Sequence, residues 1–205
     1  MANKLYFYFI RFKKSSLPEI LNRTREFLFL KTLKIAPVFF LRNLKAPEVT
    51  PEALKQIKLP PIFGEIDDKT INSILAGHCF CLNHDHSPIK SFEKKWKKTF
   101  FTEISIKSDV PDIRAVWEPA RLQHLLIVLH KISEAWDNVE LKDFVRSNIL
   151  EWIKHNKFLH GPHYISVMEC GHRIPVFLFA LRVLDNLKEN ERRLILQTVF
   201  EHAWI

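Results

Sequence analysis

The chain has 205 residues, a length typical of one domain, and 47% of them are hydrophobic, which excludes a wholly disordered protein. Only 4 residues are glycine, which argues against folds built from many tight turns and against glycine-rich phosphate loops. The 31 Lys and Arg residues exceed the 23 Asp and Glu residues, so the net charge of +8 favours an acidic partner such as nucleic acid, anionic lipid or an acidic polysaccharide.

Targeting signals and disulfides are not predicted. The first ten residues are largely apolar and the basic residues follow them, which is the reverse of the order in a secretory signal. No apolar run reaches the ~18–20 residues of a membrane span, so we expect none. Three cysteines do not make a disulfide framework. By default we expect a cytoplasmic protein.

Short helices joined by Pro-rich connectors are predicted for the N-terminal third. Ser16 and Glu19 have the spacing of a capping box, and Pro18 suits a first turn, so a helix should begin here. Its expected apolar side consists of Ile20, Leu21, Phe27 and Leu28. Similar signals predict helices at 50–58 and 68–76, with an extended connector at 59–62.

The middle of the chain should be extended and the remainder helical. Alternating polar and apolar residues predict an extended segment over 100–106, followed by a turn at 109–112. Apolar residues then recur at helical spacing in four stretches, 122–132, 141–152, 165–184 and 194–204. The third stretch is apolar nearly all round, so that helix should be buried between others. Short loops predict antiparallel neighbours.

A first candidate site for chemistry is the stretch from His78 to His86, which contains five potential zinc ligands. Structural zinc sites usually combine a close pair of ligands with a distant pair, and no distant pair is evident. We therefore predict no metal site here, but two packed thiols, Cys79 and Cys81, before a solvated His-rich turn.

A second candidate is Lys94-Lys95-Trp96-Lys97-Lys98, where basic residues alternate with an aromatic ring. Such a pattern can bind a nucleic-acid backbone and stack on its bases. A charge run of this length is more often a solvated face, so we predict no nucleic-acid binding.

Two further stretches carry polar residues on otherwise apolar helices. The first, residues 117–125, places an Arg, a Gln and a His at the start of a helix, where they can hold a carboxylate or sulfate. An internal Glu118–Arg121 ion pair is the alternative. The second, residues 160–173, places Glu169 and Arg173 four residues apart in a helix expected to be buried. Such a pair either neutralises itself or lines a cavity.

Together these two stretches resemble the N-terminal domain of the heparinase II/III family of polysaccharide lyases. The family's first motif is of the type Trp-Glu-Leu-Asn-Arg-x-Gln-His-Leu, and the matching residues are Trp117, Glu118, Arg121, Gln123, His124 and Leu125. The second motif is Asn-Trp/Tyr-x-Ser-x-Met-Glu-x-x-x-Arg, and the matching residues are Tyr164, Ser166, Met168, Glu169 and Arg173. Pro119 and Ala120 depart from the first motif, and His163 replaces the usual Asn of the second.

The resemblance implies a mainly all-α fold, an incomplete α/α toroid of antiparallel helical hairpins behind an irregular N-terminal region. The expected single domain, 1–205, would comprise short helices and connectors over 1–114 and the toroid hairpins over 115–205. The implied activity is β-elimination of a uronate-containing polysaccharide, without cofactor or metal. The family's catalytic Asn, Tyr and His lie after the helix that ends this chain, so we expect a truncated, inactive lyase with no catalytic residue.

The resemblance also implies a polysaccharide groove. Its candidate substrate-binding residues are Trp117, Glu118, Arg121, Gln123, His124, Tyr164, Glu169 and Arg173. The two arginines would bind carboxylate or sulfate groups, the two glutamates would orient the arginines or bond sugar hydroxyls, and Trp117 could stack on a sugar ring. Alternatively, the same residues lock the inner helices together.

A different class of function is a non-enzymatic, basic helical module that binds nucleic acid or a protein. Binding of acidic polysaccharide that depends on Arg121 would favour the lyase hypothesis, whereas nucleic-acid binding that depends on residues 94–98 would favour the module. The open end of an unfinished toroid, near Trp204, could also drive self-association.

Overall fold

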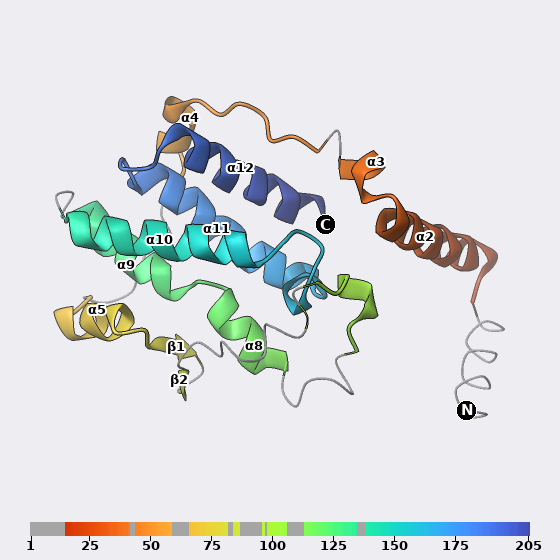
Figure 1. Ribbon diagram of the computed structural model, residues 1–205, viewed down its shortest axis with the longest axis horizontal. Coiled ribbons are helices and arrows are strands. Elements are labelled where there is room, and N and C mark those ends of the chain that lie inside the picture. The colour runs from red at the N-terminus through yellow and green to blue at the C-terminus, as the bar shows by residue number, and fades with distance from the viewer. Residues whose placement is uncertain are drawn as a thin grey trace. The chain divides into compact units, whose positions relative to one another are not determined.

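The computed structural model describes residues 15–41, 44–58, 66–81, 84–86, 96, 98–105, 113–134 and 138–205 (Figure 1). The chain divides into two compact units, residues 1–44 and 45–205. The elements are α2 (Leu17–Ile35), α3 (Pro37–Leu41), α4 (Pro51–Lys55), α5 (Asp68–Leu75), β1 (Cys79–Cys81), β2 (His84–His86), η1 (Phe101–Glu103), α8 (Ile113–Ala120), α9 (His124–Glu134), α10 (Val139–His155), η2 (Pro162–Tyr164), α11 (Val167–Val183) and α12 (Glu189–Trp204). The described chain is therefore mainly helical, as predicted.

The first unit contains α2 and α3. Helix α2 begins where the sequence predicts, with Pro18 in its first turn, but Ser16 makes no capping bond through its side chain. Glu19 is the acceptor of a 2.5 Å bond from Arg23 instead. The side of α2 expected to be apolar is exposed at Leu21 and Phe27, and the buried residue of the helix is Leu33.

Two short helices of the second unit begin at side chains that accept backbone N–H bonds. The hydroxyl of Thr50 accepts from the N–H of Ala53, and the carboxylate of Asp67 accepts from the N–H of Thr70. Helix α4 ends at Lys55, three residues short of the predicted end, and α5 is followed by Gly77 with a φ of 90°. Glycine adopts this left-handed conformation without a steric cost, which explains why the helix stops there.

The prediction of an extended segment over 100–106 is wrong in part. Phe101–Glu103 form a 3₁₀ turn, and the extended conformation returns at Ile104. Phe100 makes a single antiparallel bridge with His160. One bridge does not make a β-strand, because a strand needs hydrogen-bonded partners at several successive residues. Residues 106–112, with the predicted turn, lie outside the described residues.

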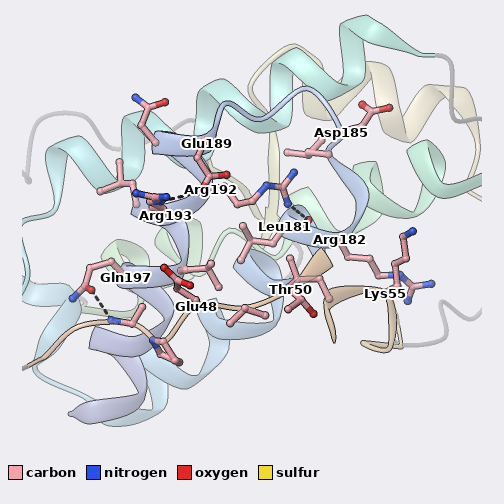
Figure 2. Close-up of a pocket in the computed structure, with 18 of the residues that line it drawn as sticks. Glu48, Thr50, Lys55, Leu181, Arg182, Asp185, Glu189, Arg192, Arg193 and Gln197 are labelled. Atoms are coloured by element: carbon pink, nitrogen blue, oxygen red, sulfur yellow. Dashed lines mark hydrogen bonds and ion pairs between the residues drawn. The ribbon is translucent and has the colours of Figure 1, made fainter. Parts of the chain in front are cut away.

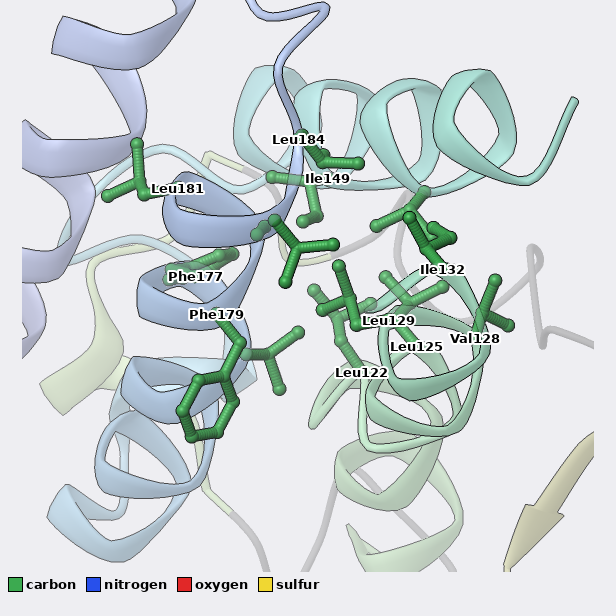
Figure 3. Packing of buried hydrophobic residues seen from close by; sticks show 14 of the residues in the cluster. Leu122, Leu125, Val128, Leu129, Ile132, Ile149, Phe177, Phe179, Leu181 and Leu184 are labelled. Carbon is green, nitrogen blue, oxygen red and sulfur yellow. The ribbon is translucent and has the colours of Figure 1, made fainter. Parts of the chain in front are cut away.

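The core of the second unit lies between α9, α10, α11 and α12, which alternate in direction along the chain (Figure 1). Leu125 and Leu129 of α9 and Phe177 of α11 are fully buried (Figure 3), and the Phe177 ring contacts the rings of Trp152 and His202. Burial of each such side chain contributes about 1.5–3 kcal/mol. The predicted helical spacing of apolar residues is confirmed in these helices. None of the helices within the described ranges is long and apolar enough to cross a membrane.

The turn between α8 and α9 has an unusual backbone. Leu122 has a φ of 59°, a left-handed conformation that costs a non-glycine residue about 1–2 kcal/mol. Its side chain is nevertheless buried in the core, which offsets that cost. Helix α8 was not predicted as a separate element, because residues 117–125 were expected to form the start of a single helix.

Helix α12 begins at Glu189, five residues earlier than the stretch predicted from its apolar spacing. The carboxylate of Glu191 accepts a bond from the backbone N–H of Lys188, which stabilises the first turn. Arg146 of α10 binds the same carboxylate and lowers the pKa of Glu191. Residues 188–191, whose polar side chains predict a turn before the helix, are therefore a capped helix start.

Candidate functional site

The two motifs meet at an ion pair between Arg121 and Glu169. Arg121 follows α8, and Glu169 lies in the first turn of α11. Nε and Nη2 of Arg121 donate to the two carboxylate oxygens of Glu169 at 2.8 and 2.6 Å. The side chain of Glu169 is fully buried, whereas 19% of the Arg121 side chain is exposed. The ion pair that forms thus joins two motifs, and not Glu118 to Arg121 within one of them.

Arg173, one turn after Glu169, is fully buried. Its Nη2 donates to the carbonyl oxygen of His163 at 2.7 Å, and its Nε donates to Nε2 of His202 at 2.9 Å. The guanidinium also lies 4.8 Å from the ring centre of Trp152, a distance suited to a cation–π interaction. Arg173 therefore joins α11 to η2, α10 and α12, and its burial favours the helix-locking alternative for this residue.

His202 was not predicted as part of the site. Nδ1 of His202 lies 2.8 Å from the carbonyl oxygen of Thr198, so the proton sits on Nδ1 and Nε2 is free to accept from Arg173. Burial and, to a smaller extent, the positive charge of Arg173 lower the pKa of His202 to about 3. A signal existed in the sequence, because Ile195, Thr198 and His202 recur on one buried face of α12.

Tyr164 and Trp117 fix η2 against its neighbours. The hydroxyl of Tyr164 donates to the carbonyl oxygen of Asn156 at 3.1 Å, and burial raises the pKa of this phenol well above its usual value. Nε1 of Trp117 donates to the carbonyl oxygen of Pro162 at 2.8 Å. Tyr164 is 2% exposed, whereas the Trp117 side chain is half-buried, so only Trp117 retains a ring surface toward solvent.

The solvent side of the site is the turn between α8 and α9. Gln123 is exposed, and His124, the first residue of α9, is half-buried. Burial lowers the pKa of His124 to about 4, so its ring is neutral at pH 7. Glu118 is 8% exposed. The predicted residues therefore divide into an accessible group (Trp117, Arg121, Gln123 and His124) and a buried group (Glu118, Tyr164, Glu169 and Arg173).

The other candidate sites receive no support from the described residues. The side chains of residues 79–86 lie outside them, and β1 and β2 are described as an antiparallel hairpin through their backbone alone. No group of three His, Cys, Asp or Glu residues in the described ranges could hold a metal ion. Of the 94–98 stretch, Trp96 is buried beside Ile104 and Val116, so its ring is not exposed for base stacking.

No family model, curated protein or solved structure matches this chain. The resemblance to polysaccharide lyases therefore rests on the sequence motifs alone.

Proposed function

We propose that this chain is the N-terminal helical part of a heparinase II/III-like lyase, that its hairpins belong to an α/α toroid, and that it binds an acidic, uronate-containing polysaccharide. The observation that carries the proposal is the Arg121–Glu169 ion pair, which joins the two motifs of the resemblance over a separation of 48 residues. A contact between residues of both motifs supports the proposal, because it places the two motifs at one site.

The binding surface that we propose is the accessible group at the α8–α9 turn. Arg121 is oriented by Glu169, and its partly exposed guanidinium can attract a carboxylate or sulfate. Gln123 and His124 can add hydrogen bonds to sugar hydroxyls, and the half-buried ring of Trp117 can stack on a sugar. The net charge of +8 supports an acidic ligand.

The buried group has a different role in this proposal. Glu169 and Arg173 are completely inaccessible to solvent, so they cannot touch a polysaccharide without a rearrangement of α11. We assign them, with Tyr164, to the positioning of the α8–α9 turn and of η2. Buried charges that have partners can hold one arrangement of helices, because any slip would leave a charge unpaired.

Binding without cleavage is the expected activity, because the resemblance assigns no catalytic residue to this chain. The test is titration of the whole chain with oligomers of alginate and of heparin by calorimetry at low salt. The informative variant is Gln123→Glu, which adds a negative charge beside Arg121 at an exposed position. The matched control is Gln56→Glu, an identical substitution at an exposed position after α4.

We expect Q123E to weaken binding severalfold and Q56E to leave it nearly unchanged. Equal losses in both variants would show a general charge effect and contradict the site. Absence of binding by the wild-type chain would contradict the proposed function. A salt-sensitive gel shift with RNA, without polysaccharide binding, would favour the basic-module alternative.

A further inference from the structure

A groove of about 1280 Å³ lies between residues 45–55 and the two helices α11 and α12 (Figure 2). One wall is the irregular segment that leads into α4. The other is the end of α11, the connection after it and the first half of α12. The floor is aliphatic: Leu54 and Leu181 line it, and Leu194 of α12 is 44% exposed there.

Two arginines in this groove are anchored but carry uncompensated charge. Nη1 of Arg192 donates to the carbonyl oxygen of Leu181 at 3.0 Å, and Nη1 of Arg182 donates to the carbonyl oxygen of Ile57. Neither forms an ion pair with a carboxylate of the described residues. Bonds of this kind hold a guanidinium in place while its charge stays available to an anion.

The carboxylates of the groove do not offset these arginines. Asp185 binds Lys142 at 2.9 Å, and Glu189 binds Arg193 at 2.8 Å. The other charged residues of the lining are Lys45, Lys55 and Glu48. The groove is therefore positive, with the charge of Arg182 and Arg192 set against an aliphatic floor.

The segment beside the arginines is extended and has unused backbone groups. Pro47 and Pro51 restrict the residues before them to extended conformations, and Thr50 has a φ of −73° and a ψ of 151°. The N–H of Ala46 donates to the side chain of Gln197 at 2.9 Å, which ties the segment to α12. The N–H groups of Glu48 and Val49, in contrast, bond to none of the described residues.

We propose that this groove binds an extended peptide segment in which acidic and aliphatic residues alternate. Side chains of an extended chain point alternately to opposite sides, so acidic residues can meet Arg182 and Arg192 while aliphatic ones cover Leu181 and Leu194. The backbone of the peptide can pair with the N–H groups at 48–49, as in strand addition.

Other ligand classes fit this groove less well. Sites for single small molecules have volumes of roughly 300–1000 Å³, so this one suits a longer, chain-like ligand. None of the described residues that line the groove is a Trp, Tyr or Phe, so this lining offers no aromatic ring on which a sugar could stack. The groove shares no lining residue with the α8–α9 turn, so peptide binding here and polysaccharide binding there can be tested separately.

The test is fluorescence anisotropy of a labelled octapeptide of alternating Leu and Glu, added to the whole chain. The same peptide with Gln in place of Glu is the ligand control. Arg192→Gln should weaken binding of the acidic peptide by about tenfold, the effect of losing one charged hydrogen bond. Arg23→Gln is the matched protein control, because Arg23 lies on α2 with Glu19 as its partner and is not among the residues that line the groove, and it should bind as the wild type does.

Because Arg192 also bonds to the backbone of Leu181, its replacement could disturb the fold. A second variant therefore tests the charge of the groove at a residue without such a bond. Lys55→Glu reverses a charge at the exposed edge of the groove and should weaken binding too, whereas Lys154→Glu on α10 should not. Equal binding of the Glu and Gln peptides would overturn the proposal, as would equal binding by R192Q and R23Q. Capture of a uronate oligomer by the groove, without peptide binding, would overturn it as well.

Discussion

Replacement of His202 by Gln should change how the stability of the chain depends on pH. In the folded chain the ring is buried and lies beside the charge of Arg173, so the pKa of His202 falls to about 3 from its ordinary value of 6.5, although the bond from Nδ1 to Thr198 acts in the opposite direction. The unfolded chain takes up a proton below pH 6.5, but the folded chain does not. The free energy of unfolding must therefore decrease as the pH falls from 6.5 toward 3.

The size of this effect follows from the two pKa values. Each pH unit in that window costs about 1.4 kcal/mol. Between pH 6.5 and pH 4, His202 alone should remove about 3 kcal/mol from the free energy of unfolding. Gln keeps a side-chain oxygen that can accept the Nε–H of Arg173, but it cannot titrate, so H202Q should lose about 3 kcal/mol less than the wild type over the same range.

The assay is urea unfolding followed by circular dichroism at several pH values between 7 and 4. Contributions from other titrating groups, such as His124 and Glu191, are common to both proteins and cancel in the difference. His155→Gln is the matched control, since His155 lies on the exposed side of α10, and it should leave the pH dependence as in the wild type. Parallel curves for H202Q and the wild type would refute the reasoning.

Three further outcomes are expected. Arg121→Ala leaves the buried carboxylate of Glu169 without its partner and should lower the free energy of unfolding by about 3 kcal/mol, and adding Glu169→Gln should recover part of that loss; no recovery would argue against a charge effect. Trp117→Phe keeps a ring but loses the bond to Pro162, so denaturant unfolding should show a loss of about 1 kcal/mol, and an unchanged midpoint would mean that water replaces this bond. Incubation with alginate or heparin should give no rise in the absorbance of unsaturated uronate, and a rise would contradict the expected inactivity.

The helices of the second unit were predictable because one physical signal, apolar spacing, determines them. Leu125, Leu129 and Ile132 lie on the buried face of α9, as the spacing indicates. The start of α12 was missed because its first turn is polar and therefore carries no apolar spacing. The turn is stabilised by the bond between Glu191 and Arg146, which lies 45 residues earlier in the chain. The spacing of apolar residues on α2 did not indicate which of them is buried: Leu21 and Phe27 of the expected apolar side are exposed, and the buried residue is Leu33.

The candidate site was predictable as a set of residues but not as a set of contacts. Two motifs identified Arg121 and Glu169, yet spacing within one helix suggested Glu118 as the partner, and only the fold selects between them. The spacing of Ile195, Thr198 and His202 marks His202 as buried on α12, but it does not identify Arg173, 29 residues earlier in the chain, as its partner. Arg173 is buried and Gln123 is exposed, and this difference in solvent exposure depends on how all the surrounding helices pack.

The left-handed turn at Leu122 links affinity for a ligand to the interior of the protein. Arg121 and Gln123, the residues proposed to meet a polysaccharide, are its immediate neighbours in the chain, while the Leu122 side chain is anchored in the core. Glycine would adopt this left-handed backbone without strain but would leave the space of the leucine side chain in the core empty. Leucine fills that space but strains the backbone, so neither residue satisfies both requirements. Substitutions at this hidden position should therefore alter binding without removing any group that contacts the ligand, and a surface-only mutational scan would overlook it.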